Sequence, residues 1–397
     1  MEEERTYTRG PLRGLTPGVV RLGLVSFFAD VSSEMLYPLT PIFLTSVLGA
    51  PASVVGLIEG SAEAVASLLK SASGWLSDRT GRRRPFVLGG YVLSAFAKPL
   101  LALAHVWPTV LVARVTDRFG KGLRDSPRDA LLADATSADS RGRAFGWHRA
   151  MDSAGAVIGP GLALGLVALM HEQLRPVFVI AFVPGIIGAV LVLGVRERRR
   201  PPVPGAGAIG LRQMPPRFHG FLLGWGLFAL ANSSDVFLIL RARQLASTVT
   251  VVAMYSAYNL MYALASPVLG HLSDRLGRGR VLVGGLGTFA LVYLGFALVT
   301  RTWQLWVLFA VYGLYIAATE GVTKATAVDL VPAEVRGGAI GLLGTVSGLS
   351  ALVASGVAGI LWTAIGPGAA FAYGAAGAIV GAVVLASRLG LRAEPAA

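Results

Sequence analysis

One short segment of this chain occurs twice, 196 residues apart, and this repeat limits the folds that are open to it. The first copy is Gly74 to Arg84, GWLSDRTGRRR, and the second is Gly270 to Arg280, GHLSDRLGRGR. Two further segment pairs repeat at offsets of 195 and 201 residues: Arg141 to Gly146 with Arg336 to Gly341, and Ser32-Ser33-Glu34 with Ser233-Ser234-Asp235. Repeats at nearly one offset across 397 residues indicate two halves of about equal length, a period far beyond that of solenoid repeats.

Long apolar runs fill the sequence between the repeated segments. Hydrophobic residues make up 54% of the chain and charged residues 14%, against roughly 25% charged residues in a soluble protein. A membrane-spanning helix needs about 20 apolar residues, and only helices or closed barrels pair every backbone group in lipid. Because the runs are too long for barrel strands, we predict an all-α polytopic membrane protein. The predicted helices are 19–48, 52–76, 85–104, 107–130, 143–168, 174–195, 218–241, 249–272, 280–300, 303–328, 337–364 and 369–388.

These helices form two predicted six-helix halves, 19–195 and 218–388. The segment 196–217 between them is rich in proline, glycine and arginine, which break helices and favour a loop, so we interpret it as a linker. The segments 1–18 and 389–397 are predicted to be tails. The acidic start of the chain shows no small-residue cleavage site, so we expect no cleaved signal peptide.

The net charge of +13 is distributed unevenly. Lys and Arg gather in the tails, the linker and the repeated loops, whereas the opposite loops hold Arg175, Arg241, Arg243 and Arg301. This is the positive-inside pattern, which predicts a multi-pass protein of the inner (plasma) membrane with both termini in the cytoplasm. Anionic lipid headgroups are a sufficient partner for these arginines, so nucleic acid is not expected as one.

The whole chain resembles the major facilitator superfamily of secondary transporters, with twelve helices in two pseudo-symmetric halves. The repeated segment matches the family's loop G-x-x-x-D-R-x-G-R-R, and Gly155 to Gly165 resembles the glycine-proline motif of its antiporters. Arg118-Phe119-Gly120-Lys121-Gly122 resembles the fourth-helix motif R-x-x-Q-G, with Lys in place of Gln, and Arg114 is a rival for the motif arginine. Within the family the chain resembles bacterial proton-coupled exporters.

The resemblance implies alternating access, in which the halves rock about a site near the middle of the membrane, in a protein that works as a monomer. It also implies a gating role for the motif residues. These are Gly74, Asp78, Arg79, Gly81, Arg82, Asp274, Arg275, Gly277, Gly155, Gly159 and Pro160.

Four carboxylates fall within the first two predicted helices. Asp30 and Glu34 are four residues apart and share one helix face, as do Glu59 and Glu63. An ionisable group at bilayer depth is unfavourable unless paired or hydrated, and by default marks a pathway or proton relay. Desolvation and nearby like charges favour the protonated form of a carboxyl group. We therefore predict that these four, with Asp235 as the echo of Glu34, bind protons or a cation.

Other polar and aromatic side chains inside the predicted helices are candidates for substrate binding. The fourth predicted helix carries charges of alternating sign at three- and four-residue steps, and the eighth carries tyrosines along one face. An alternative for Glu320 is a simple helical ion pair with Lys324. The candidates are Lys98, Arg114, Arg118, Lys121, His148, Asp152, Tyr255, Tyr258, Asn259, Tyr262 and Glu320.

These features predict a transporter rather than an enzyme, driven by the proton gradient and without a cofactor. The first hypothesis is a proton-coupled antiporter that exports a small molecule, either drug-like or a charged metabolite. A second is an exporter of a metal ion or metal chelate that uses the intramembrane carboxylates as oxygen ligands, with a nitrogen from His148. A third is a proton-coupled importer of an organic anion bound by Lys98, Arg114, Arg118 and Lys121.

Overall fold

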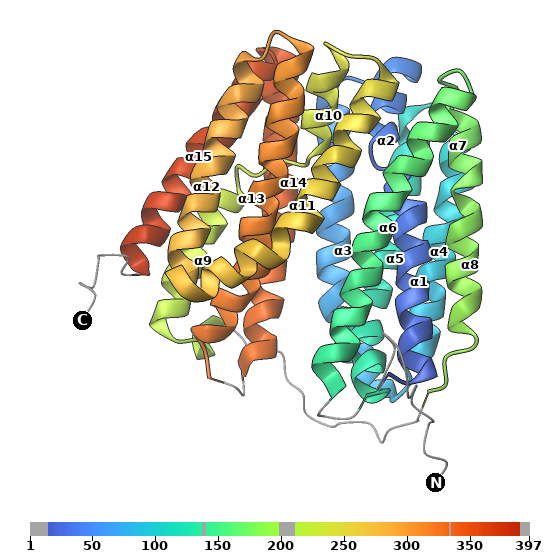
Figure 1. Ribbon diagram of the computed structural model, residues 1–397, viewed down its shortest axis with the longest axis vertical. Coiled ribbons are helices and arrows are strands. Elements are labelled where there is room, and N and C mark those ends of the chain that lie inside the picture. The colour runs from blue at the N-terminus through green and yellow to red at the C-terminus, as the bar shows by residue number, and fades with distance from the viewer. Residues whose placement is uncertain (1–14, 137–139, 198–210, 333–334, 390–397) are drawn as a thin grey trace. The chain divides into compact units, whose positions relative to one another are not determined.

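A computed structural model describes residues 15–136, 140–197, 211–332 and 335–389. Most of the predicted tails and of the linker 196–217 lies outside these residues. The helices before the linker are α1 Pro17–Glu34, α2 Leu39–Ile42, a π-helix Phe43–Val47, α3 Ala52–Thr80, α4 Arg84–Ala102, α5 Trp107–Asp134, α6 Arg141–Leu169, α7 Leu174–Ile180 and α8 Phe182–Val192. Those after it are a 3₁₀ turn Leu211–Gln213, α9 Pro216–Ala229, α10 Val236–Arg243, α11 Thr248–Leu276, α12 Arg278–Leu298, α13 Thr302–Asp329, α14 Arg336–Ala364 and α15 Pro367–Arg388 (Figure 1).

Within the described residues, nine helices are long and apolar enough to cross a membrane. The predicted spans outside this set are the first, fourth and seventh. Each 18-residue stretch of α1 or α5 carries more than two charged residues, and the seventh span is divided into α9 and α10. Charges inside α1 and α5 therefore set these helices apart from ordinary spans.

The first and seventh predicted spans are broken where the sequence repeats Ser-Ser-acid. The α-helix α1 ends at Glu34 and α2 begins at Leu39, while α10 begins directly after Asp235. The sixth span also divides, at Ala181, whose carbonyl accepts a hydrogen bond of 2.6 Å from Ser32 Oγ. The prediction of one continuous helix is therefore wrong for the first and seventh spans. Pro38 has no N–H to donate to the helical ladder of the first span, and in the seventh the Ser234 N–H donates to Ser355 Oγ. The sixth span still counts as one membrane-length helix, Leu174–Val192, with a turn at Ala181.

The chain packs into two compact units. The first comprises residues 1–48 and 65–206, and the second comprises 49–64 and 207–397. The beginning of α3 therefore belongs to the second unit, where Gly56 and Gly60 allow close approach to the backbone of Ser355 and Leu352 in α14.

Corresponding helices of the two units match in length and position. The helices α5 and α13 each contain 28 residues, and α6 and α14 each contain 29. Their first residues, Trp107 with Thr302 and Arg141 with Arg336, are both 195 positions apart. An offset of 195 therefore pairs structurally equivalent positions in these helices.

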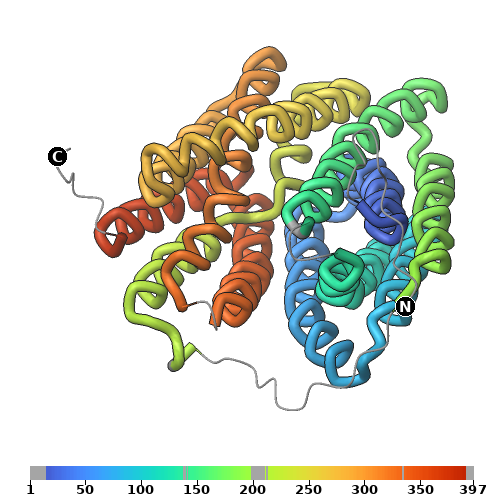
Figure 2. The backbone as a smooth tube through the Cα atoms, turned by 60° about the horizontal axis from the view of Figure 1, so that its bottom comes forward, coloured from blue at the N-terminus to red at the C-terminus, as the bar shows by residue number. Residues whose placement is uncertain are grey.

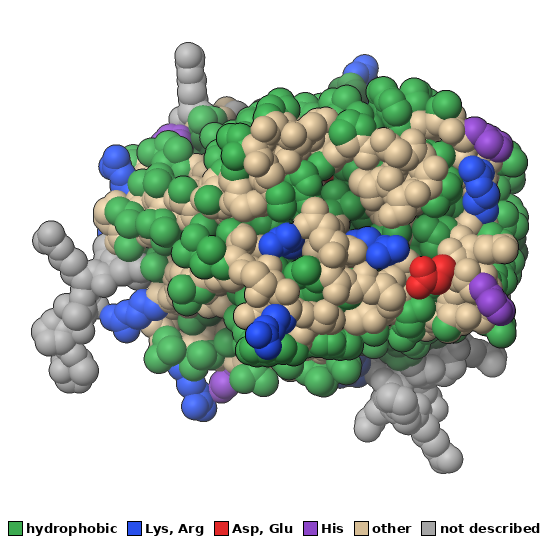
Figure 3. All heavy atoms as spheres, turned by 90° about the horizontal axis from the view of Figure 1, so that it is seen from above, with side chains coloured by type: hydrophobic (Ala, Val, Ile, Leu, Met, Phe, Trp, Pro, Cys, Tyr) green, Lys and Arg blue, Asp and Glu red, His purple; other side chains and the backbone are tan. Residues whose placement is uncertain are grey.

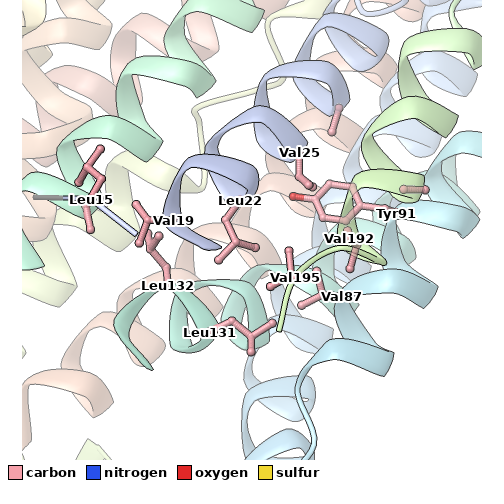
Figure 4. Close-up of a cluster of buried hydrophobic side chains, with 13 residues drawn as sticks. Leu15, Val19, Leu22, Val25, Val87, Tyr91, Leu131, Leu132, Val192 and Val195 are labelled. Carbon is pink, nitrogen blue, oxygen red and sulfur yellow. The ribbon is translucent and has the colours of Figure 1, made fainter. Parts of the chain in front are cut away.

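In each unit, the "loop end" is the end of the helices that carries the repeated loop, at Gly81 in the first unit and Gly277 in the second. A buried core holds the loop end of the first unit together, with Val19, Leu22, Val87, Leu131 and Val192 packed between α1, α4, α5 and α8 (Figure 4). Figure 2 shows these helices nearer to end on. Thr16 caps α1 by accepting from Val19 N, and its hydroxyl donates to Ala135 O at 3.1 Å.

Large apolar side chains cover much of the surface. Leu169, Leu291 and Leu298 are among the most exposed, and hydrophobic side chains cover far more of the face seen in Figure 3 than charged ones do. Exposed apolar surface of this extent marks contact with lipid or another apolar partner. The helices thus bury their polar side chains and present apolar ones outward, as a membrane protein requires.

Candidate functional site

The repeated loop of the first unit is organised by Arg83. Gly81 adopts a φ of +63°, which favours glycine, and turns the chain from α3 into α4. The Arg83 guanidinium donates to Asp78 Oδ1 at 2.9 Å and also pairs with Asp134 at the end of α5. Its backbone N–H donates to the Glu197 carboxylate, which follows α8. One arginine therefore joins the loop ends of α3, α4 and α5.

The second unit repeats this arrangement with fewer contacts. Gly277 adopts a φ of +90°, and Arg278 pairs with Asp329 at the end of α13 and with Asp274 at 3.6 Å. Asp134 and Asp329 are 195 positions apart, so they are a further pair of repeated residues, one that was not predicted from the sequence.

Arg83 with its acidic partners is called the arginine clamp of the first loop, and the same name is used for Arg278 in the second unit. The other predicted gating residues of the first loop lie around its clamp. Gly74 faces α5, where a Cβ would lie 3.1 Å from Ser126 Cβ. The Arg79 guanidinium lies 5.2 Å from the Trp75 ring centroid, while Arg82 and Arg275 are exposed.

The glycines of the α6 motif pack directly beneath the acidic side chains of α1. A Cβ on Gly155 would lie 2.9 Å from Asp30 Cβ, and one on Gly159 would lie 2.9 Å from Glu34 Cβ. Real Cβ atoms do not approach so closely, so glycine is needed at both positions. Pro160 lies within α6 directly after this contact. The structure thus joins the predicted gating glycines to the predicted proton-binding carboxylates.

A buried ion pair links α4 to α5. Lys98 Nζ lies 2.7 Å from Asp117 Oδ1 and 3.4 Å from Ser33 Oγ of α1. Arg114 Nη1 lies 3.7 Å from Asp117 Oδ2, and the Arg114 guanidinium is 5.9 Å from the centroid of the Tyr37 ring. Two of the cations predicted to bind substrate are therefore engaged with one carboxylate.

The remaining charges of α5 form a second group toward the loop end. Arg124 is buried against the Tyr91 ring, 4.3 Å from its centroid, and donates to Ser94 Oγ at 2.6 Å. Asp125 lies 3.7 Å from both Lys70 and Arg128. The charges of alternating sign along this helix thus form a set of specific pairs with one another and with neighbouring helices.

Two further predicted cations lie on the same helix. Arg118 is half-buried and acts electrostatically on Asp117, whereas Lys121 is exposed and acts on Asp30 and Asp125.

His148 and Asp152 form a pair one helical turn apart on α6. His148 Nδ1 lies 3.5 Å from Asp152 Oδ2, and the histidine is buried. Among the described residues, His148 Nε2 and Asp152 Oδ1 have no hydrogen-bond partner. Buried polar atoms are nearly always bonded, so these two call for an explanation.

The second unit places Asp235 among tyrosines. Tyr312 donates to Asp235 Oδ1 at 2.6 Å, and Tyr258 donates to Oδ2 at 3.2 Å. Tyr293 donates to the Ser233 carbonyl at 3.4 Å, and the ring centroid of Tyr315 lies 5.2 Å from that of Tyr312 with the two rings tilted by 40°. The break between α9 and α10 is thereby tied to α11, α12 and α13 by aromatic side chains.

The other candidates of the second unit are engaged close by. The Tyr262 hydroxyl donates to Glu320 Oε2 at 2.5 Å, and Lys324 lies 3.6 Å from Glu320 Oε1, as the helical ion pair predicts. Asn259 Nδ2 donates to the Tyr255 carbonyl at 3.1 Å. Of the tyrosines in this cluster, Tyr255 and Tyr258 were predicted from the sequence as candidates for substrate binding. Tyr293, Tyr312 and Tyr315 were not.

The predicted group of four carboxylates is divided between the units. Asp30 and Glu34 belong to the first, whereas Glu59, which is buried, and Glu63, which is exposed, belong to the second. In the part of the chain that the structure describes, no three His, Asp or Glu side chains are grouped so that they could hold a metal ion.

Two units of apolar helices built on one repeat, with paired charges inside, define a polytopic helical membrane transporter. The chain belongs to the Major Facilitator Superfamily, whose family model matches residues 22–241 and again 220–397. An uncharacterized transporter of this type from Methanocaldococcus jannaschii is 36% identical over 353 residues, covering 86% of this chain and 87% of that protein. The multidrug resistance protein MdtH of Aeromonas hydrophila is 28% identical, covering 68% of this chain and 70% of its own.

Solved structures agree on the fold. A transporter of the POT family in complex with 5-aminolevulinic acid has a TM-score of 0.79 at 13% identity, covering 95% of this chain and 97% of its own. A mutant of the nucleoside transporter NupG has a TM-score of 0.76 at 14% identity, covering 95% of this chain and 100% of its own. The chain is therefore a secondary transporter with this fold, and not an enzyme.

Proposed function

We propose that this transporter is a proton-coupled antiporter that exports a small molecule from the cytoplasm. The observation that carries the proposal is the contact of Gly155 and Gly159 with the turns of α1 that bear Asp30 and Glu34. Protonation would change the charge at a point where the two helices are in close contact. A ligand or proton shifts a conformational equilibrium by its differential affinity for the two states, and a charge change at such a contact supplies that difference.

Export is supported by the relatives. MdtH and MdtG, at 28% and 25% identity, are both named multidrug resistance proteins. The distribution of Lys and Arg supports a loop end that faces the cytoplasm, in the inner membrane. In this orientation the arginine clamps at Arg83 and Arg278 would keep each half rigid while the halves rock, and so would serve the cytoplasmic gate.

The second unit is the proposed side for an organic substrate. Asp235 combines a carboxylate with tyrosine rings and hydroxyls, and Asn259 adds an amide nearby along α11. Aromatic faces and a few polar groups are the usual lining of small-molecule sites.

The two other hypotheses have less support. Lys98 and Arg114 are paired with Asp117, which reduces their value as anion-binding groups. The described residues also contain no group of three His, Asp or Glu side chains that could hold a metal ion, which weakens the case for a metal site.

The test is a thermal-shift screen of the purified full chain at pH 6 and pH 8. The panel holds tetraphenylphosphonium, ethidium, divalent metal ions, ferric citrate and citrate alone. A compound at 100 times its Kd should stabilise the protein by about 2.7 kcal/mol. We expect an organic compound to stabilise the protein less at pH 6, and Asp30→Asn with Glu34→Gln to remove this pH dependence.

Stabilisation by a bare metal ion or ferric citrate, lost in the same variants, would instead support the metal exporter. Stabilisation by citrate alone, lost in Arg118→Ala, would support the anion importer. Either result would overturn the proposed antiport of an organic molecule.

A further inference from the structure

One face of α6 carries titratable groups and glycines in a single column. His148, Asp152, Gly155 and Gly159 follow at steps of four, three and four residues, which places them on the same side of the helix. At the two glycine positions of this face, Asp30 and Glu34 of α1 lie against α6. His148 and Asp152 therefore continue, toward the loop end, the helix face whose glycines contact Asp30 and Glu34. The four positions of α6 span about 16 Å, at 1.5 Å per residue.

The column connects with exposed groups at the loop end. Asp129 of α5 has a side chain that is 43% exposed, compared with 19% for Asp152 and 6% for His148. Asp129 acts electrostatically on His148, and Asp152 acts on Asp30. Carboxylate and imidazole groups thus follow one another from the loop end toward the C-terminal end of α1, where Asp30 and Glu34 lie.

The charges around His148 come from α5 and α6. They are Arg128, Asp125 and Asp129 of α5 and Asp152 of α6. Arg128 is itself held by Asp129 at 3.0 Å and by Ser26 Oγ of α1 at 3.3 Å, and Tyr91 of α4 acts on it. Burial and Arg128 thus oppose a protonated imidazole, whereas the three acids favour it, so a proton on this ring would be held only in transit.

The two ring nitrogens of His148 have different surroundings. Histidine is the side chain that gains and loses a proton near neutral pH. Nε2 is buried and has no bonded partner among the described residues, while Nδ1 faces Asp152. A proton can bind at Nε2 while another leaves Nδ1 for the carboxylate, which restores a neutral ring as the other tautomer.

The equivalent interface of the second unit needs no such groups. An offset of 195 pairs His148 with Leu343 and Asp152 with Ser347 of α14. Leu343 is buried, and Ser347 accepts a hydrogen bond of 2.9 Å from Trp225 Nε1 of α9. An apolar residue and a small polar residue are therefore enough to pack α14 at these positions, where α6 carries His148 and Asp152.

We propose that Asp129, His148 and Asp152 form a proton-transfer path between the loop end and the carboxyl groups of Asp30 and Glu34. The path rests on the proposed proton coupling, and it adds the route by which protons enter and leave from one side. Its steps are proton transfers only: Asp129 or water delivers a proton to Nε2, Nδ1 releases one to Asp152, and Asp152 passes it to Asp30. No bond other than those to hydrogen changes.

The experiment is time-resolved infrared spectroscopy of the purified full chain after flash release of a caged proton. The carboxyl stretching band reports protonation of buried acids, and Asp30→Asn with Glu34→Gln should remove the slow, buried part of its amplitude. In His148→Gln we expect the same final amplitude, reached at least tenfold more slowly. Added imidazole should restore the rate, which a purely structural role of His148 would not allow.

The control is His271→Gln, an exposed histidine on α11, which should change neither rate nor amplitude. If His148→Gln does not fold, Asp129→Asn carries the same prediction, since that side chain is much more exposed than that of His148. An unchanged rate in His148→Gln, with normal amplitude, would overturn the path and leave proton coupling intact. If the wild-type protein lacks the slow part of the carboxyl band that reports buried acids, the proposed proton coupling itself would be overturned.

Discussion

The helices α5 and α13 have the same length and equivalent positions, yet they carry different chemistry. Lys98 and Asp117 of the first unit form an ion pair beside Ser33, and an offset of 195 pairs them with Tyr293 and Tyr312 of the second. Those tyrosines surround Asp235 and Ser233 instead. The same two positions next to the break in the first helix of each unit thus hold a charge pair in one unit and aromatic hydroxyls in the other.

The same contrast holds for α6 and α14. Gly155 and Gly159 correspond to Ser350 and Ala354, so α6 lacks side chains where α14 has them. One scaffold therefore supports two specialised halves. The first keeps titratable groups in close helix contacts, and the second keeps an aromatic cluster around one carboxylate.

The largest expected effect comes from leaving one member of the buried ion pair without its partner. Asp117→Ala would leave Lys98 buried beside a cavity, and breaking a buried pair in this way typically costs about 3–5 kcal/mol. We expect a loss of this size in the free energy of unfolding, measured in detergent. The loss in Tyr312→Phe should be clearly smaller.

The control for this prediction is the double variant Lys98→Met with Asp117→Leu. Replacing both charges by apolar side chains of similar volume is often neutral, but Arg114 also lies 3.7 Å from Asp117, so we expect a loss that is clearly smaller than in Asp117→Ala and not zero. Equal losses in the single and double variants would show that the pair is not an isolated unit, and the contrast with the tyrosines would fail.

The next effect concerns the hydroxyl groups around Asp235. Tyr312→Phe removes the donor at 2.6 Å, and hydrogen bonds to charged groups contribute about 1.5–3 kcal/mol. Tyr258→Phe removes the longer bond of 3.2 Å and should have the smaller effect. Thermal unfolding of both variants on the Asp235→Asn background measures the coupling, and purely additive losses would argue against a bonded cluster.

Much of the fold could be predicted from the repeats and apolar runs, because both follow local sequence. The breaks in the first and seventh spans could not, although their signals were present. Pro38 cannot continue a hydrogen-bonded helix, and Asn, Ser and Asp at 232–235 favour caps over helix interiors. The long apolar runs outweighed these signals in the prediction.

The site was predicted less completely, for a physical reason. Periodicity shows which residues share a face of one helix, but pairs such as Lys98 with Asp117 depend on the register between helices, which sequence spacing does not contain. Asp134 and Asp329 could have been found from the offset alone. In the sequence, Tyr312 is not distinguishable from the apolar residues of its helix, and only the structure shows that its hydroxyl donates to Asp235.

A smaller effect is expected where α6 contacts α1. Gly159→Ala places a Cβ 2.8 Å from the Val31 carbonyl and 2.9 Å from Glu34 Cβ, and such overpacking costs about 1–3 kcal/mol. The matched control is Gly161→Ala on the same helix, since nothing in the described chain lies within 4 Å of its Cβ position. Gly161→Ala should be neutral or slightly stabilising, and equal thermal midpoints for the two variants would contradict the close contact.

The smallest effects are expected at the two arginine clamps, where the units are most alike. The Arg83 side chain is 17% exposed and bonds three segments, whereas that of Arg278 is 31% exposed and pairs with two exposed acids. Exposed pairs contribute about 0.2–1 kcal/mol, so we expect Arg83→Ala near the upper limit and Arg278→Ala near the lower. At 1 M salt the screening length falls to about 3 Å, which should remove the effect of Arg278→Ala in thermal unfolding and leave most of that of Arg83→Ala. Equal effects at both salt concentrations would mean that the clamps are equivalent, and that the two halves diverged only within the membrane.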